Sequence, residues 1–256
     1  MVRSGELLSD GLVLLETVRL VEDALGDGFQ IPKVLISRSA KAGVRSLLKK
    51  LSSETTVYEV SSEVFESLAS TESSQGILAL AAAPVWREED LFPPASTLVL
   101  VLAGLQDPGN LGAIIRTAEA FGVTGIILTE GSASPYNAKV VRAAAGALLR
   151  MPMLHDLTVA KALSLLARHK VRLFVGVVEG GKRLPAIGFT GPIAVAVGSE
   201  GAGLPKELAA AGEHLTIPIA GTVESLNVAA ATAVILYEIA RQRKSKSEPR
   251  PGGSGS

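Results

Sequence analysis

Apolar runs in the second half of the chain constrain its fold more than any other feature. They are TLVLVLAG (97–104), GIILTE (125–130), VRLFVGVV (171–178), IAVAVG (193–198) and HLTIPIAG (214–221). A strand with one solvated face alternates apolar and polar residues, whereas a strand covered on both faces is apolar almost throughout. Helical segments are expected between these runs, near 110–121, 137–149, 158–169, 204–211 and 225–242. The pattern predicts an α/β domain with a parallel sheet covered on both faces.

Residues 1–85 show a similar alternation on a smaller scale. Short apolar runs (LVLLE, KVLIS, TVYEV, ILALAAAP) alternate there with helix-like stretches, which predicts a small α/β domain. Charge and a Pro pair in WREEDLFPPAS (86–96) predict a linker to the larger domain of residues 97–243. The polar, Gly/Ser-rich end (244–256) predicts a disordered tail.

Composition limits the chemistry. The 256-residue chain has a formal net charge of +0, so nucleic-acid binding would need a local basic face. It contains no cysteine, which excludes disulfides and thiolate chemistry and fits a reducing cytoplasm. Its three histidines lie far apart, so we expect no metal site. No apolar run approaches the ~20 residues of a membrane span, so we expect a cytoplasmic protein without a membrane partner.

Polar and Gly-rich residues collect directly after the apolar runs. The segments are GLQDPGNLG (104–112), TEGSASP (129–135), VEGGKR (178–183), GSEGAG (198–203) and PIAGTVESLN (218–227). Ligands of open α/β sheets bind at the carboxyl ends of strands, so one shared site is expected. The loop GSEGAG by itself also fits a plain turn whose glycines supply positive φ. A dinucleotide site is disfavoured because Glu200 would repel a pyrophosphate.

Three segments carry a family resemblance. DPGNLGAIIRTAEAFG (107–122), AVAVGSEGAGLP (194–205) and TIPIAGTVESLNVAAATAVILYE (216–238) closely resemble the motifs of the SpoU (TrmH-like) RNA ribose 2′-O-methyltransferases of the SPOUT class. Residues 1–85 more weakly resemble the L30e-like RNA-binding domain that often precedes that domain. The resemblance implies a trefoil-knotted α/β domain, a homodimer and S-adenosylmethionine as cofactor.

Motif positions imply the site residues. Catalytic roles fall on Asn110, Arg116, Glu200, Ser225 and Asn227. Because a guanidinium stays protonated, Arg116 is expected to fix the RNA phosphate and polarise the 2′-oxygen. The proton would then be lost to phosphate or water, and Glu200 would either orient Arg116 or accept the proton itself. Ser225 also fits the N-cap of the helix that follows. The implied cofactor-binding residues are Thr129, Glu130, Gly131, Val178, Gly198, Ile217, Ile219, Ser225, Leu226 and Val228. No metal is required.

One stretch can supply a basic face. No acidic residue lies between Asp27 and Glu54, and Lys41, Arg45 and Lys49 recur every four residues, so they would share a helix face. This face either contacts RNA phosphates or is merely solvated. The N-terminal extension favours ribosomal RNA over transfer RNA as the substrate, with housekeeping and resistance roles both open.

Two other classes of function fit the sequence less well. A non-catalytic RNA-binding or ribosome-assembly protein on the same fold would be expected to carry damaged motifs, and here the five catalytic positions match. A nucleotide-dependent oxidoreductase would need a Gly-rich turn directly after the first strand, which GLQDPGN does not provide.

Overall fold

The computed structural model describes residues 7, 10–40, 42–70, 75–199, 201 and 203–247. Their contacts group the chain into two compact units. The first comprises Met1–Val85, Asp107–Arg116 and Ala133–Arg150, and the second comprises Trp86–Gln106, Thr117–Ser132 and Met151–Ser256. The domain boundaries expected from the sequence, 1–85 and 97–243 with a linker between them, stay a prediction.

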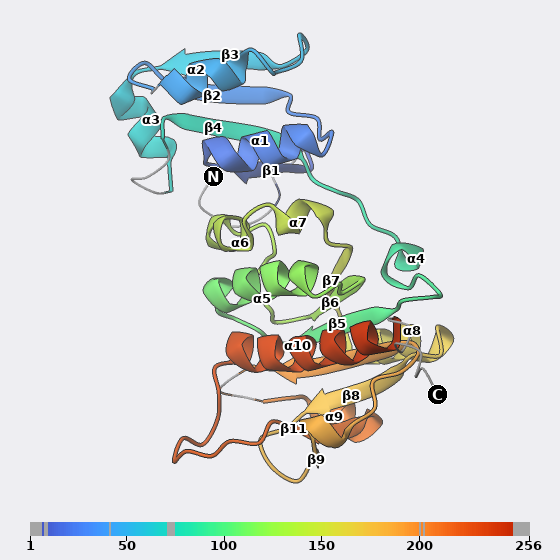
Figure 1. The fold of residues 1–256 in the computed structure, drawn as a ribbon. Helices are drawn as coiled ribbons and strands as arrows, with labels where there is room; N and C mark the ends of the chain where they lie inside the picture. Colours follow the sequence, from blue (N-terminus) through green and yellow to red (C-terminus); the bar gives the residue numbers. More distant parts are fainter. Residues whose placement is uncertain are drawn as a thin grey trace, which may run out of the picture. The chain divides into compact units, whose positions relative to one another are not determined.

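The first unit contains a four-stranded sheet in the order β1-β4-β2-β3 (Figure 1). Its strands are β1 (Leu12–Leu15), β2 (Lys33–Ser37), β3 (Thr56–Val60) and β4 (Ile77–Ala82). β4 is antiparallel to β1 and β2, whereas β2 and β3 are parallel. The connecting helices are α1 (Val18–Gly26), α2 (Ala42–Leu48) and α3 (Ser62–Leu68). Thr17 and Ser61 cap α1 and α3 through their hydroxyls. The expected small α/β arrangement is confirmed.

Two short helices of the first unit replace the single helix expected over 137–149. They are α6 (Ala138–Ala144) and α7 (Ala147–Arg150). Between them Ala145 and Gly146 have φ of 49° and 86°, in the left-handed region that ends a helix. Helix α5 (Pro108–Ala120) approaches α6 closely, because a Cβ on Gly112 would lie 2.5 Å from the Cβ of Ala143.

A seven-stranded sheet in the order β7-β6-β5-β10-β8-β11-β9 organises the second unit, and its pairings are parallel. The strands are β5 (Leu98–Ala103), β6 (Gly125–Thr129), β7 (Met153–Leu157), β8 (Arg172–Gly176), β9 (Lys182–Arg183), β10 (Ile193–Gly198) and β11 (Glu213–Thr216). The predicted parallel sheet is confirmed. Strands β7 and β9 have no counterpart in the sequence prediction.

Helices cover both faces of this sheet. α8 (Val159–Arg168) and α9 (Lys206–Ala211) pack in one core cluster with Ala194 and Ala196 of β10. The long helix α10 (Val228–Ser247), red in Figure 1, also contacts β10, and its Ile235 lies beside Val197. Because side chains alternate along a strand, the two groups of helices lie on opposite faces. This accounts for the uniformly apolar strands.

Two segments expected to be irregular contain helix. The predicted linker includes α4 (Glu88–Leu91), and Leu91 and Phe92 are buried in the core of the second unit. A Cβ on Gly125 would lie 2.4 Å from the Leu91 side chain, so α4 packs directly on β6. Residues 244–247 continue α10 rather than beginning the disordered tail. The remaining tail residues lie outside the described part of the chain. Among the described helices, none is both long and apolar enough to cross a membrane.

Candidate active site

A cavity of about 200 Å³ opens in the second unit where β8, β10 and β11 end. Its wall continues through the segment after β11 into the first turns of α10. The structure brings a large part of the predicted cofactor-binding set into this wall: Val178, Gly198, Ile217, Ile219, Ser225, Leu226 and Val228. Residues separated by up to 50 positions in the sequence therefore share one cavity, as the convergence of strand ends predicts.

The wall of the cavity is neutral. Among the described lining residues none carries a charge; most are aliphatic, and the side-chain polar groups are the hydroxyls of Ser199 and Ser225. At the rim, Val178 is 56% exposed and Ile219 is 37% exposed. Exposed aliphatic side chains beside a pocket provide apolar surface for a flat ring. The described part of the lining is therefore suited to a neutral, nucleoside-like group, and it places no cation where a pyrophosphate would need one.

The loop after β10 is held by its own backbone. The Gly203 amide donates to the Ser199 carbonyl at 2.9 Å, and Gly203 has a φ of 66°. Gly201 lies in the same loop. Glu200, expected as a catalytic residue here, lies outside the described residues.

The end of β6 holds the remaining predicted cofactor-binding residues, Thr129, Glu130 and Gly131. None of the three belongs to the described lining of the cavity. Thr129 is buried, and its hydroxyl accepts from the Gly104 amide at 3.2 Å, which ties the end of β6 to the loop after β5. Their cofactor contacts stay a prediction.

Asn227 is the N-cap of α10. Its side-chain oxygen accepts from the amides of Ala229 and Ala230 at 3.0 and 3.3 Å, which satisfies donors that a helix start leaves free. The alternative that Ser225 caps this helix is wrong: Ser225 precedes the cap by two residues and its exposed side chain lines the cavity. Of the two polar residues before α10, Ser225 thus lines the cavity and Asn227 caps the helix.

Asn110 and Arg116 lie on α5, in the part of this helix that belongs to the first unit. Leu111, Ile114 and Ile115 form the packing face of α5 and are fully buried. Arg116 is exposed, and its contact with the substrate stays a prediction.

Asp107 fixes the start of α5. Its carboxylate accepts from the Gly109 amide at 2.6 Å, and this hydrogen bond, with Lys139 3.6 Å away, lowers the pKa of Asp107 below its ordinary value. The sequence analysis assigns no role to Asp107. The available signal was the sequence Asp-Pro-Gly, because Asp is a preferred residue before a helix and Pro is favoured at its first position.

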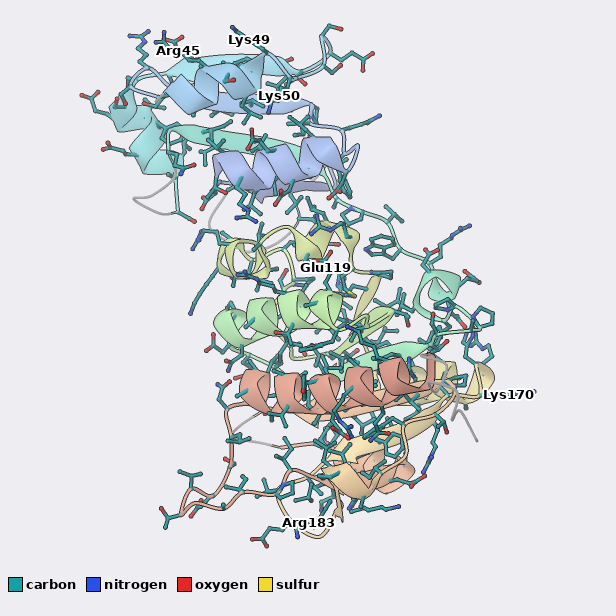
Figure 2. The ribbon with its side chains drawn as sticks, viewed as in Figure 1. Arg45, Lys49, Lys50, Glu119, Lys170 and Arg183 are labelled. Atoms are coloured by element: carbon teal, nitrogen blue, oxygen red, sulfur yellow. The ribbon has the colours of Figure 1, made fainter. Side chains whose placement is uncertain are left out.

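The predicted basic face is partly described. Arg45 is exposed on α2, and Lys49 is exposed in the turn that follows this helix (Figure 2). Lys50, beside them, pairs with Glu22 at 3.0 Å. Lys41 lies outside the described residues. Within the described chain, no group of three or more His, Cys, Asp or Glu residues is placed to hold a metal ion.

Comparison with known proteins assigns the fold to a class, the SPOUT-type methyltransferases. The model of the SpoU rRNA Methylase family matches residues 97–237, and that of the MRM3-like substrate binding domain matches residues 8–79. The chain belongs to the SpoU rRNA methylase family. The family resemblance predicted from the three motifs is confirmed, as is an N-terminal substrate-binding domain.

Similar sequences and solved structures agree with this family assignment. An uncharacterized tRNA/rRNA methyltransferase of Synechocystis is 38% identical over 250 residues, 96% of this chain and 88% of the relative. The 23S rRNA (guanosine(2553)-2′-O)-methyltransferase of Bacillus subtilis is 30% identical over 227 residues, 88% of this chain and 87% of the relative. The structure of an AdoMet-bound rRNA methyltransferase from Sinorhizobium meliloti superposes with a TM-score of 0.78 at 30% identity, covering 91% of this chain and 88% of that one.

Proposed function

We propose that this protein transfers the methyl group of S-adenosylmethionine to a ribose 2′-hydroxyl in RNA, with ribosomal RNA as the substrate. The observation that carries the proposal is the neutral cavity at the ends of β8, β10 and β11, which lies within the residues that match the SpoU family. A transfer RNA substrate and a non-catalytic role in ribosome assembly are the alternatives that the experiment below separates.

The lining fits the cofactor. Adenosine is a neutral, flat group, and Val178 and Ile219 offer it aliphatic surface while the cavity wall supplies backbone groups and two hydroxyls. Ser225, Leu226 and Val228 would hold the cofactor from the start of α10, and Thr129, Glu130 and Gly131 are proposed as further contacts. When bound, S-adenosylmethionine supplies an electrophilic methyl group on a sulfonium.

The chain's own residues would position and activate the acceptor. A ribose hydroxyl is a poor nucleophile, so its proton must be taken up as the new bond forms. Arg116 would hold an RNA phosphate and polarise the 2′-oxygen while remaining protonated. Asn110 and Ser225 would orient the acceptor, and Glu200 would orient Arg116 or accept the proton. Asn227 would act indirectly, by fixing the start of α10, since its side-chain oxygen accepts hydrogen bonds from two backbone amides.

The proposal includes assembly and substrate binding. Residues 1–85 would bind RNA, with Lys41, Arg45 and Lys49 facing phosphates. The larger domain would form a trefoil knot, and the protein would be a homodimer located in the cytoplasm. On α10, Val234 is 41% exposed and Tyr237 is 58% exposed, with the Tyr237 ring edge-on to Phe121 at 6.3 Å between centroids. Exposed apolar side chains on one helix support a subunit contact there.

The test is methyl transfer by the purified protein. Ribosomal and transfer RNA are incubated with radiolabelled S-adenosylmethionine, and the modified ribose is mapped by its resistance to alkaline cleavage. Arg116→Ala should abolish transfer while S-adenosylhomocysteine affinity stays within a few-fold, and Lys161→Ala, an exposed cation on α8, should leave both unchanged. Saturable S-adenosylhomocysteine binding without transfer to either RNA would contradict the proposal in favour of a non-catalytic role.

A further inference from the structure

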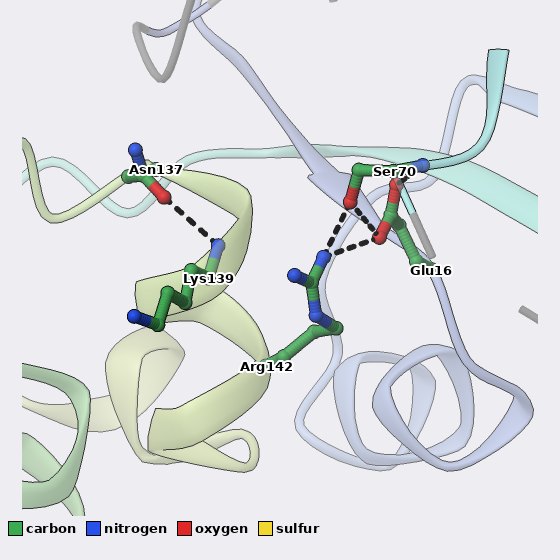
Figure 3. A network of polar contacts seen from close by, with 5 residues as sticks. All are labelled: Glu16, Ser70, Asn137, Lys139 and Arg142. Atoms are coloured by element: carbon green, nitrogen blue, oxygen red, sulfur yellow. Dashed lines mark hydrogen bonds and ion pairs between the residues drawn. The ribbon is translucent and has the colours of Figure 1, made fainter. Parts of the chain in front are cut away.

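A buried carboxylate of the first unit forms an ion pair with an arginine that is far away in the sequence. Glu16 follows β1 directly and is 1% exposed. Its carboxylate accepts from a guanidinium Nη1 of Arg142 on α6 at 2.6 Å, and from the hydroxyl and amide of Ser70 at 2.5 and 2.9 Å. Arg142 also donates to the Ser70 hydroxyl, so the three side chains form one network (Figure 3). Because a buried carboxylate is costly when unpaired, the network holds α6 at this place.

Two further contacts follow along the same two segments. Asp27, which ends α1, pairs with Arg150, which ends α7, at 2.6 Å. Between these ion pairs, Gly146 meets Asp23 of α1, where a Cβ on the glycine would lie 2.9 Å from a carboxylate oxygen. Gly146 thus lies against the Asp23 side chain, and its φ of 86° is one that a larger residue adopts only with strain.

These three contacts form a regular series, which we name the docking seam: Glu16–Arg142, Asp23–Gly146 and Asp27–Arg150. Its members in the α6–α7 region, Arg142, Gly146 and Arg150, are spaced four residues apart in the sequence. Acids of the β1–α1 region thus meet arginines of the α6–α7 region at both ends of the series. Opposite charges at two separated points set both the position and the direction of docking.

The docking seam is connected to α5 through α6. Its β1–α1 side lies within residues 8–79, which match the substrate-binding domain, and its other side lies within residues 97–237, which match the SpoU family. α6 in turn packs closely on α5 where Gly112 meets Ala143. Asn110 and Arg116, on the same stretch of α5, belong to the same compact unit.

We propose that Glu16, Arg142, Asp27 and Arg150 are positioning residues that lock the substrate-binding domain onto α6 and thereby set the place of bound RNA relative to Asn110 and Arg116. The inference rests on the proposed function for its catalytic consequence. A domain held only by a flexible chain would still bind RNA, but it would present the ribose in many orientations. Methyl transfer needs one orientation, and small misplacements of reacting groups slow such reactions strongly.

Distance measurements test the docking directly. The chain has no native cysteine, so spin labels can be placed at Ser46→Cys on α2 and Lys139→Cys on α6, both exposed positions. The doubly labelled protein should give one narrow distance distribution, and adding Glu16→Gln or Arg150→Asp should broaden it. An unchanged distribution in both variants would overturn the proposal.

A charge exchange tests the catalytic consequence. Asp27→Arg and Arg150→Asp each place like charges together and should lower kcat on long RNA by about tenfold or more. RNA affinity and S-adenosylhomocysteine affinity should stay within about twofold of wild type, because neither binding site is altered. The double variant restores an opposite pair and should recover most of kcat. Unchanged kcat in the single variants, or no recovery in the double variant, would contradict the role.

Failure of the proposed function gives a different result. If the wild-type protein transfers no methyl group to any RNA, the function is wrong, whereas the label distances still decide whether the docking seam holds the domain. A loss of S-adenosylhomocysteine affinity in parallel with kcat would assign the four residues a general structural role and overturn positioning.

Discussion

A Cβ atom on Gly198 would lie 2.2 Å from the carbonyl oxygen of Gly203, so the loop after β10 closes on a position where no side chain fits. Both glycines line the cavity. The obstacle is backbone rather than the end of a flexible side chain, so a substituted residue would have to move the loop itself. The shape of the proposed cofactor pocket therefore depends on glycine at 198.

Gly198→Ala should weaken S-adenosylhomocysteine binding by about tenfold or more, since overpacking typically costs ~1–3 kcal/mol. Isothermal titration calorimetry measures it. Gly201→Ala is the matched control in the same loop, because a Cβ there meets nothing within 4 Å, and its affinity should match wild type. Equal affinities for wild type and Gly198→Ala would mean that the loop rearranges freely or that the ligand binds elsewhere.

The Glu88 cluster gives a pH prediction. A ring nitrogen of His169 and a guanidinium nitrogen of Arg168 each lie 2.8 Å from the Glu88 carboxylate, and the His169 ring stacks on Phe92. The hydrogen bond from His169, helped by Arg168, lowers the pKa of Glu88 below its ordinary value of 4.5. A lowered folded-state pKa means that the stabilisation is complete above the unfolded pKa and is lost as pH falls through the folded one.

Glu88→Gln should therefore lower the Tm by about 2 to 4 °C at pH 7. The difference from wild type should shrink as the pH falls below 4.5, the ordinary value for this group. Thermal melts followed by circular dichroism at several pH values test this. Glu89→Gln, at the next position of α4 and exposed, is the control without an expected change. A wild-type advantage that persists undiminished in acid would show that Glu88 acts through packing rather than charge.

The sheet of the second unit was largely predictable. β5 and β10 are apolar at every position except the terminal glycine of β10, and they lie side by side in the middle of the sheet with helices on both faces. Burial on both sides leaves no place for the alternating polar residues that usually mark a strand, so the pattern is direct evidence for a covered sheet. That one site would form at the strand ends followed from the same logic, since parallel strand ends converge, whereas the individual cavity residues were implied by the family resemblance.

Other features depend on contacts that the sequence does not display. β7 carries His155 and Asp156 beside a register shift, with Asp156 at a φ of 57°, so its alternation is broken. β9 has two residues and exists only by pairing with β11. Asn227 caps α10 although Ser225 is an equally good capping type. The docking seam joins residues 126 positions apart, a separation for which no local pattern exists.

The end of α10 should depend on Arg243. Its guanidinium donates to the carbonyls of Ser96, Thr97 and Gly191 at 3.0 to 3.1 Å, which ties the helix to two other segments of the second unit. Arg243→Ala should lower the free energy of unfolding by about 1 to 3 kcal/mol, the usual cost of losing hydrogen bonds to a charged group. Arg243→Lys should recover only part of the lost free energy of unfolding, because an ammonium group lacks the planar set of donors of a guanidinium.

Urea unfolding at neutral pH measures the Arg243 effect. Arg241→Ala is the matched control: Arg241 pairs with Glu238 on the same helix and is more than half exposed, so its loss should be smaller. If both variants unfold at the same urea concentration as wild type, the three carbonyls are satisfied by water instead.

The basic residues of α2 and of the turn after it give the last prediction, which concerns RNA binding. Arg45 and Lys49 are both exposed at one end of the first unit. If they contact phosphates, replacing both with Gln should weaken RNA binding similarly for different sequences and flatten its salt dependence by about 0.7 to 0.9 log units per lost contact. Counterion release causes this slope, so it reports the number of phosphates neutralised. Lys161→Gln with Lys170→Gln removes two exposed cations from the second unit and should leave the slope unchanged. RNA affinity measured at several salt concentrations decides the matter: an unchanged slope for Arg45→Gln, Lys49→Gln would mean that the face is solvated and that RNA binds elsewhere.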